Sequence, residues 1–176
     1  MNTVPSHIYH LGRLGVAGDR VVIDATDDER AAIAQLANLV RLPRFSGTVD
    51  LKKLSATRYR LDYTLTADPV QACVVTLADV PEVIEKTFTR ELHFSAVSSR
   101  AKADIGDEII ITPEEDGQPE EIDSLQFDLA APLLEEFLLA LEPYPRAPGV
   151  VFAPPEAPLD GPENPFAALK GLKSRL

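Results

Sequence analysis

The longest strongly apolar stretch of the chain lies between Asp123 and Pro145, and its pattern predicts a helix that buries one side. Apolar residues recur every four positions, at Leu129, Leu133, Phe137 and Leu141, with Leu134 and Leu138 beside them. This period is typical of the apolar face of an amphipathic helix. The opposite face should carry Asp128, Pro132, Glu135, Glu136 and Leu139. Leu139 would then be exposed, either as a partner contact or as a scattered surface leucine.

The ends of this helix carry their own signals. Asp128 is a suitable N-cap, and Pro132 would lie in the first turn, where a missing N–H costs little. Pro143 and Pro145 should end the helix, because proline cannot continue it.

The first part of the chain predicts two short strands and one helix. Ser6–Leu11 and Arg20–Asp24 have strand patterns on either side of the loop Gly12–Gly18. Thr26 and Glu29 form a T-x-x-E capping box, which marks the start of a helix. The apolar stripe of this helix should be Ile33, Leu36, Ala37 and Val40, with Pro43 as its stop.

Four further strands are predicted, at Gly47–Leu54, Arg58–Leu65, Val70–Leu77 and Val83–Phe94. Val70–Leu77 is apolar on both faces, so it should be a central strand. Lys86 and Arg90 interrupt the apolar face of the last strand and should lie near an edge. Short connections favour antiparallel pairing. The expected fold is therefore α+β: an antiparallel sheet, open or barrel-like, with both helices packed on it.

The alternation of side chains restricts the pairing of the first hairpin. Opposed residues share a face, so Leu51 must meet Tyr59 or Leu61 rather than Arg60. The register with Leu51 opposite Tyr59 also sets Asp50 against Arg60, and this pair of opposite charges favours it.

Composition divides the chain into three parts. Residues 1–145 should form a single α+β domain, with a short strand at Ile109–Ile111 inside the acidic segment Asp104–Asp123. Prolines dominate residues 146–163 and predict an extended linker. In residues 164–176, Asn164 and Pro165 signal a helix start, and the apolar positions are Phe166, Leu169 and Leu172. So short a helix either packs on the domain or docks on a partner.

The overall charge and the cysteine count limit the function classes. The net charge of −11 argues against broad electrostatic binding to nucleic acid or anionic membrane, and suits a basic protein partner or simple solubility. A single cysteine excludes an internal disulfide framework and a cysteine-based zinc site. The chain has no signal-peptide pattern at its start and no apolar run of about 20 residues, so we expect no membrane span and a cytoplasmic location.

The residues do not form a pattern that indicates a reaction. His7 and His10 would face opposite sides of a strand, and Cys73 is expected to be an inert core thiol in the middle of one. Nucleophile elbows, phosphate loops and zinc-protease motifs are absent from the sequence. We therefore expect no catalytic residue, no cofactor and no metal.

One basic cluster contrasts with the acidic total. It consists of Arg41, Arg44, Lys52, Lys53, Arg58 and Arg60. Lys52, Arg58 and Arg60 should share the outward face of the hairpin, where like charges destabilise unless something neutralises them. That neutraliser could be RNA phosphate, an acidic protein surface, or Asp50, Asp62 and salt.

Extended patterns over most of the chain resemble the YceD family, proteins of bacteria and plastids linked to accumulation of large-subunit ribosomal RNA. The resemblance includes the segments DDERAAIAQLANLV, VQACVVTLADVPEVIEKTF, DEIIITPEEDGQPEEIDSLQFDL, APLLEEFLLALEPYPRAP and the ending ENPFAALKGLKSRL. Many members carry a C-x-x-C pair at the second segment and another pair after the long helix. Here Cys73 matches the first position, Thr76 stands at the second and the later pair is absent, so a metal role does not transfer.

The resemblance implies a role in biogenesis of the large ribosomal subunit and supplies no catalytic residues. We expect a non-enzymatic factor with ribosomal or assembly proteins as partners, docked by the acidic surface and by the helix with Phe166, Leu169 and Leu172. The alternative is direct contact with ribosomal RNA through the basic hairpin. An enzyme with a pocket between sheet and helix is a third hypothesis, which nothing in the sequence favours. The oligomeric state stays open.

Overall fold

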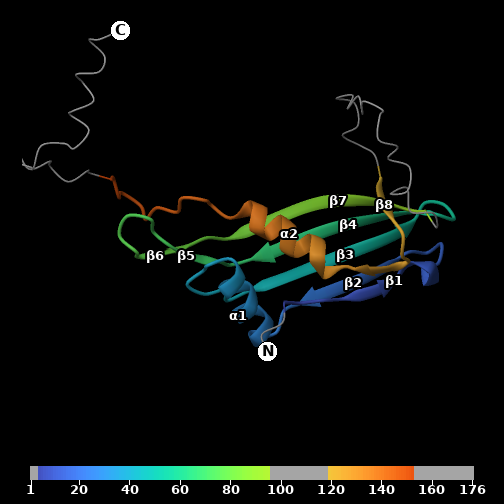
Figure 1. The fold of residues 1–176 in the computed structure, drawn as a ribbon, viewed down its shortest axis with the longest axis horizontal. Helices are drawn as coiled ribbons and strands as arrows, with labels where there is room; N and C mark the ends of the chain where they lie inside the picture. The colour runs from blue at the N-terminus through green and yellow to red at the C-terminus, as the bar shows by residue number, and fades with distance from the viewer. Residues whose placement is uncertain (1–3, 96–118, 153–176) are drawn as a thin grey trace, which may run out of the picture.

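The computed structural model describes residues 4–95 and 119–152, and these form the α+β fold that the sequence predicts (Figure 1). The main sheet has the strand order β2-β3-β4-β7-β8. Its strands are β2 (Asp19–Asp24), β3 (Phe45–Lys53), β4 (Arg58–Ala67), β7 (Ile84–Phe94) and β8 (Glu120–Ile122). Two small two-stranded sheets pair β1 (Ile8–His10) with β9 (Gln126–Asp128) and β5 (Val70–Ala72) with β6 (Asp79–Pro81). The helices are α1 (Asp27–Leu36) and α2 (Ala130–Ala140), and a 3₁₀ turn spans Leu11–Arg13.

The main sheet is open rather than barrel-like, and it is mixed rather than wholly antiparallel. Strands β2, β3, β4 and β7 pair antiparallel, whereas β8 adds to β7 in parallel. β8 covers only Leu92–Phe94 of β7. The barrel alternative is therefore wrong: β2 and β8 stand at opposite ends of the strand order, and no pairing joins them among the described residues.

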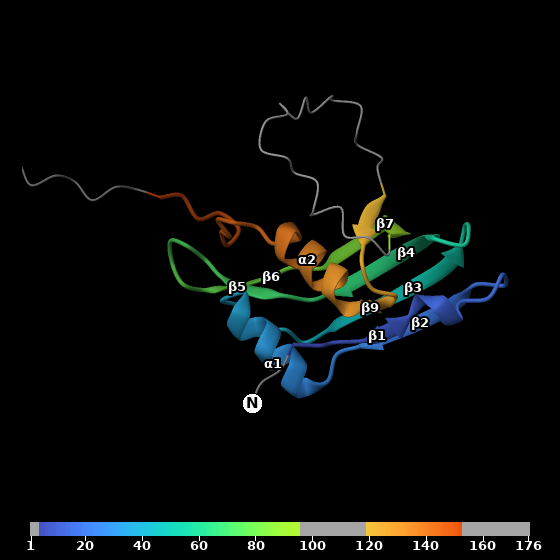
Figure 2. The same cartoon turned by 45° about the vertical axis from the view of Figure 1, so that its right-hand side comes forward.

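The core lies on one side of the sheet, under α2 (Figure 2). The inward residues of the strands form one apolar cluster with Leu129, Leu133 and Phe137 of α2 and with Ile33 of α1. Phe45 and Phe137 meet edge to face, with ring centroids 5.4 Å apart. At Gly47 the helix approaches so closely that an added Cβ would lie 2.5 Å from Cδ1 of Leu133. The predicted apolar stripe is thus what binds α2 to the sheet.

Two positions of α2 differ from the predicted faces. Pro132, expected outside, is buried, and Leu138, expected inside, is 37% exposed. The apolar face is therefore rotated slightly from the stripe read from the sequence. The helix ends at Ala140, ahead of Pro143, and Leu139 is exposed as predicted.

Helix α1 begins as predicted and ends early. Thr26 Oγ accepts from the Glu29 N–H, and the Glu29 carboxylate accepts from the Thr26 N–H, so the capping box is complete. The predicted stop at Pro43 is wrong, because Asn38 adopts a left-handed conformation (φ 53°) that terminates the helix after Leu36. Leu36 and Val40 consequently lie exposed instead of completing the apolar stripe.

The first hairpin has the register that we did not prefer. Leu51 lies opposite Leu61, and Lys53 lies opposite Tyr59. The turn selects this pairing: Leu54 N donates to the Arg58 carbonyl (2.9 Å), and Ser55 Oγ accepts from the N–H groups of Thr57 and Arg58. The expected faces of the residues are still correct, because the two registers differ by two residues.

The predicted central strand at Val70–Leu77 is also wrong. Only Val70–Ala72 is extended, in the small sheet with β6. Cys73–Leu77 forms a turn in which Leu77 N donates to the Cys73 carbonyl (2.9 Å) and Leu77 has a positive φ of 61°. Of its apolar side chains Cys73 is buried, whereas Val74 and Leu77 are 49% and 77% exposed. The turn is tied to the chain that follows α2, since Val74 N donates to the Pro145 carbonyl (2.9 Å). The predicted strand at Ile109–Ile111, most of the acidic segment and the terminal helix lie outside the described residues.

Candidate functional site

The face of the main sheet that points away from α2 is open and polar. Alternate residues of each strand reach it, and hydroxyl and charged side chains predominate. On the inner three strands they are Thr48, Asp50 and Lys52 of β3, Arg58, Arg60, Asp62, Thr64 and Thr66 of β4, and Glu85, Thr87, Thr89 and Glu91 of β7. Val22 of β2, a large apolar residue on this face, is 67% exposed. The surface is broad and solvated, and it has a shallow hollow of about 290 Å³ whose walls include Asp50, Asp62, Thr64, Thr87 and Thr89.

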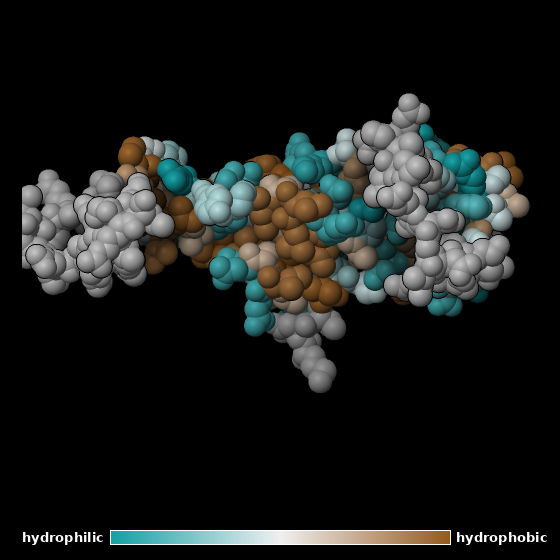
Figure 3. Space-filling view, turned by 45° about the horizontal axis from the view of Figure 1, so that its top comes forward, coloured by the Kyte–Doolittle hydropathy of each residue, from teal (hydrophilic) through white to brown (hydrophobic). Residues whose placement is uncertain are grey.

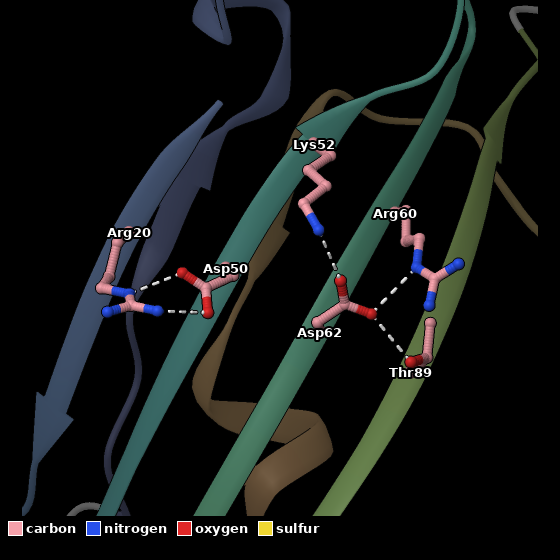
Figure 4. A network of polar contacts seen from close by, with 6 residues as sticks. All are labelled: Arg20, Asp50, Lys52, Arg60, Asp62 and Thr89. Atoms are coloured by element: carbon pink, nitrogen blue, oxygen red, sulfur yellow. Dashed lines mark hydrogen bonds and ion pairs between the residues drawn. The ribbon is translucent and has the colours of Figure 1, made fainter. Parts of the chain in front are cut away.

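Two carboxylates organise the charges on this open face (Figure 4). The Asp50 carboxylate accepts hydrogen bonds from Nε (2.6 Å) and Nη2 (2.8 Å) of Arg20 on the neighbouring strand β2. The hydrogen bonds from Arg20 lower the pKa of Asp50. Because Arg20 stands opposite Asp50 in the register, the two strands hold the pair in a bidentate geometry.

Asp62 is the second carboxylate, and three side chains converge on it. Lys52 Nζ lies 3.3 Å from Oδ2, and Arg60 Nε and Thr89 Oγ1 donate to Oδ1 at 2.9 and 2.8 Å (Figure 4). Partial burial would raise the pKa of Asp62, but the hydrogen bonds from Arg60, Thr89 and Lys52 outweigh it, and the pKa is lowered. The observed register sets Lys52 against Arg60 and Asp50 against Asp62. The like charges are offset by these diagonal and neighbouring-strand contacts.

The structure separates the predicted basic cluster. Lys52, Arg58 and Arg60 share the open face as expected, and each has a carboxylate close by, since Arg58 lies 3.5 Å from Glu91. Elsewhere, Arg41 pairs with Asp79 (2.6 Å) and Arg44 with Asp68 (3.0 Å). Lys53 points to the opposite face from Lys52, because it stands next to it in the strand. Surface pairs of this kind contribute little to stability, but they leave the face with little unbalanced positive charge.

A third charged cluster lies on the covered side of the sheet, beside α2, and sequence reasoning missed it. Arg90 of β7 contacts Glu135 (2.6 Å) and Glu136 (3.9 Å) of α2, and also Glu120 of β8 (3.7 Å). One guanidinium thus meets three carboxylates where α2 overlies β7. The interruption of the apolar face at Lys86 and Arg90 was the signal in the sequence, but the partners are distant along the chain.

Cys73 is fully buried, but it is not in the middle of a strand. Its thiol accepts hydrogen bonds from the Thr76 side chain and from the backbone N–H groups of Ala147 and Val75, and these lower its pKa to about 6. The contact with Ala147 ties the turn to the segment that follows α2. In the part of the chain that the structure describes, no group of three or more His, Cys, Asp or Glu residues is arranged to hold a metal ion.

A shallow groove of about 580 Å³ lies between α1 and the segment that follows it. Its walls include Asp27, Arg30, Leu39, Val40 and Leu42. Asp27 and Arg30 form an ion pair with each other along the helix, and Arg30 also donates to the Ala25 carbonyl. These charges are satisfied within the helix start, so the groove does not present converging free ionisable groups.

Some sequence predictions fall where the structure gives no answer. Phe166, Leu169 and Leu172, the candidate docking residues of the terminal helix, lie outside the described residues. Within the described ranges, neither helix is long and apolar enough to cross a membrane.

Comparison with known protein families identifies a match. A family model described as large ribosomal RNA subunit accumulation protein YceD matches residues 61–173, which is more than half of the chain. No curated protein and no solved structure matches this chain. The matched range begins inside β4 and includes β7 and α2, so it covers the whole Arg90 cluster but only Asp62 and Thr89 of the Asp62 cluster, because Lys52 and Arg60 precede it.

Proposed function

The chain belongs to the YceD family of large ribosomal RNA subunit accumulation proteins, and from that premise we propose that it supports accumulation of large-subunit ribosomal RNA without being an enzyme, by binding a protein partner. This family role implies that it acts in the cytoplasm. The observation that carries the choice of a protein partner is the neutralised open face of the sheet, where Lys52, Arg58 and Arg60 each contact a carboxylate.

Electrostatics favour a protein over RNA as the direct partner. Affinity for nucleic acid comes largely from Lys and Arg side chains that replace the counterions of phosphates. On this face a phosphate would have to displace Asp62 from Lys52 and Arg60, and Glu91 from Arg58. The chain as a whole carries a net charge of −11, which repels RNA and attracts basic proteins.

The proposal of a non-enzymatic role rests on packing and on charge geometry. The contact between α2 and the sheet is filled, with Leu133 against Gly47 and Phe137 against Phe45. The charged clusters at Asp62 and Arg90 satisfy themselves on open surfaces, whereas acid–base catalysis uses groups whose pKa values are moved apart in a sheltered site. A binding module needs no such site.

Affinity purification of the full chain at near-native salt, with and without nuclease, tests the proposal. We expect specific partners to remain after nuclease treatment. Loss of all specific co-purifying material on treatment would contradict the protein-partner proposal and favour RNA as the bridge or the ligand.

Charge-neutral variants separate the two alternatives further. Replacing Arg58→Gln and Arg60→Gln together removes the basic face while keeping side-chain length, and Arg146→Gln is a control outside the cluster. If the chain bound RNA through this face, the double variant would lower the salt slope of log K by about 1.4 to 1.8, which is two phosphate contacts. We expect no such change, and nuclease-resistant partners should be retained by both variants.

A further inference from the structure

Within the described part of the chain, the long strand β7 has a backbone edge that is open over most of its length. β4 pairs with β7 along its whole length, but β8 pairs only with Leu92–Phe94 on the other side. In residues 4–95 and 119–152, nothing pairs with Ile84–Glu91 on that side. Figure 1 shows the same arrangement, with β8 meeting β7 at one end only. The open stretch is about 26 Å long at ordinary strand rise.

The hydrogen bonds at the end of β7 tell which residues point outward along this edge. The Phe94 N–H donates to Thr57, which precedes β4, whereas the Ser95 N–H donates to Ile122 on β8. The register with β4 is continuous, without a bulge. Because direction alternates along an antiparallel strand, the N–H and C=O groups of Glu85, Thr87, Thr89 and Glu91 face the open edge. These groups form a regular template for one more strand.

The two sides of this edge differ in chemistry. On the open face of the sheet, Glu85 and Glu91 flank the template, since their side chains point there. On the covered side, Arg90 reaches Glu135 of α2, so this flank of the helix overlies the edge. Leu138 and Leu139 lie one turn further along the same flank and are 37% and 71% exposed. Figure 3 shows apolar surface gathered over the middle of the molecule, where α2 lies.

We propose that the open edge of β7 binds an extended segment of a protein partner as an added strand, and that the side chains of this segment alternate between basic and apolar. In a strand, successive side chains point to opposite faces. The basic ones would therefore meet Glu85 and Glu91, and the apolar ones would meet Leu138 and Leu139. This inference rests on the proposed function, because it assumes a protein partner, and it specifies where and how that partner binds.

Charge argues against a second copy of the chain as the occupant. Antiparallel pairing of two β7 edges, centred on Phe88, would set Lys86 against Arg90 on one face and Glu85 against Glu91 on the other. Like charges would thus oppose each other on both faces, which destabilises the pairing. Inward-pointing charges such as Lys86 and Arg90 are a known protection of edge strands against self-association. A segment of alternating basic and apolar residues would instead place basic side chains opposite Glu85 and Glu91, where opposite charges attract.

The test uses the full chain and a defined peptide probe. The probe is a fluorescent eight-residue peptide, Lys-Val repeated four times, and its binding is followed by anisotropy. Two matched controls are the same peptide with every backbone amide N-methylated, which removes its donors in either strand direction, and Glu-Val repeated four times, which reverses the charge. We expect saturable binding of the Lys-Val peptide, and at least tenfold weaker binding of each control peptide.

Matched variants locate the binding. Thr87→Pro removes an outward N–H that has no partner among residues 4–95 and 119–152, a position where an edge strand tolerates proline, whereas Thr87→Ala keeps it. We expect binding to weaken at least tenfold for Thr87→Pro and to stay unchanged for Thr87→Ala. Should Thr87→Pro fail to fold, Glu85→Lys leaves the backbone intact and should weaken the Lys-Val peptide while strengthening the Glu-Val peptide.

Hydrogen exchange gives an independent readout on the wild-type chain. In the free protein the amides of Glu85, Thr87, Thr89 and Glu91 should exchange fast, and the Lys-Val peptide should protect them. Protection of these amides in the free monomer would mean that the chain's own segment occupies the edge. A concentration-dependent dimer that Thr87→Pro abolishes would mean that a second copy does. Either result overturns the inference, as does equal binding by Thr87→Pro and Thr87→Ala or no saturable binding of the Lys-Val peptide.

The two proposals fail in different ways. If nuclease-resistant partners co-purify equally with wild type and Thr87→Pro, the edge is not the docking site and the proposed function still stands. If nuclease removes all specific material, the proposed function fails whatever the peptide does.

Discussion

Tyr63 is a buried side chain whose polar atom lacks a hydrogen bond in the described part of the fold. Its ring stacks on Phe88, with centroids 4.6 Å apart and planes within 2°. Its hydroxyl oxygen is inaccessible and has no hydrogen-bond partner, and burial raises the pKa of the phenol. A tyrosine held for its ring alone carries a desolvation cost that phenylalanine would not.

Replacing Tyr63→Phe should therefore leave stability unchanged or raise it by about 1 kcal/mol, because it removes an unpaired buried hydroxyl. Urea unfolding of both proteins measures the difference. Tyr59→Phe is a control at a second buried tyrosine of β4. Destabilisation by more than about 1 kcal/mol at Tyr63 would show that the hydroxyl has a partner.

Cys73 should make stability depend on pH around neutrality. Its pKa is about 6 in the folded chain because Thr76 and the N–H groups of Ala147 and Val75 donate to the sulfur, and about 8.5 in an unfolded chain. Between these values the unfolded chain holds a proton that the folded chain has released. Stability therefore rises with pH through this range and is lost as pH falls through 6.

The thiolate absorbance of the native protein should titrate with a midpoint near 6. The Tm of wild type minus the Tm of Cys73→Ser should increase as pH rises from about 6 to about 8.5. Cys73→Ser keeps every other titrating group, so the difference between the two curves isolates the thiol. A midpoint close to 8.5 would contradict the hydrogen-bonded geometry.

At the scale of elements, the contact between α2 and β3 depends on the absence of a side chain at Gly47. An added Cβ there would lie 2.5 and 2.8 Å from the two methyl carbons of Leu133. Leu133 is fully buried, so it cannot move aside cheaply. The glycine is needed for close approach and not for an unusual backbone conformation.

Gly47→Ala should cost about 1 to 3 kcal/mol through overpacking. Gly15→Ala is the matched control, since nothing lies within 4 Å of its added Cβ, and it should be nearly neutral. Leu133→Ala will also destabilise the protein on its own. The double variant Gly47→Ala with Leu133→Ala should lose about 0.5 to 3 kcal/mol less unfolding free energy than the two single variants lose together. Additive costs in urea unfolding would indicate that α2 shifts to accommodate the methyl group.

The elements also show where pattern reading stops. Alternation along β4 and the capping box of α1 are local, and both were predicted correctly. The turn at Cys73–Leu77 was predicted as strand because its residues are apolar, but its conformation depends on hydrogen bonds to Pro145 and Ala147, about 70 residues away. The end of α1 at Asn38 lacked a strong signal, since asparagine only tolerates the left-handed conformation.

At the scale of the whole molecule, Asp128 joins the N-terminal segment to the start of α2. Its carboxylate accepts from the Ser6 hydroxyl (2.7 Å), from the His7 N–H (2.8 Å) and from the Ala130 N–H at the start of α2 (3.0 Å). Partial burial would raise its pKa, but these donors outweigh it and the pKa is lowered. The predicted N-cap at Asp128 was wrong by one residue, since Leu129 occupies that position without a side-chain cap. The Asp128 carboxylate nevertheless accepts from the Ala130 N–H and also holds the chain before β1.

Because its folded pKa is depressed, Asp128 should stabilise the protein above about pH 4 and lose that effect as pH falls through the folded pKa. Asp128→Asn should therefore lower stability at pH 7 and flatten the loss of stability below about pH 4. Urea unfolding at both pH values measures this. Asp123→Asn, the same charge change in the preceding loop, should affect both values little. Parallel acid profiles for wild type and Asp128→Asn would contradict the role.

The candidate surfaces could be predicted only in part. The residues of the open face followed from alternation, including Lys52, Arg58 and Arg60. Their carboxylate partners could not be predicted, because the preferred register placed Asp50 opposite Arg60. In the actual register Asp50 pairs with Arg20, and Asp62 pairs with Arg60. The open edge of β7 was not predictable, since it depends on how little of the strand β8 covers.

The sequence by itself determined which side chains of β3, β4 and β7 face the core, where α1 starts, that α2 is apolar on one side, and the likeness to the YceD family. These properties are local or cumulative along the chain. Only the tertiary structure decided the register, the pairing of every charge on the sheet, the turn at Cys73 and the open edge of β7. Registers two residues apart bury the same side chains, so a turn and the neighbouring strands must choose between them, and that choice sets which charges are neutralised.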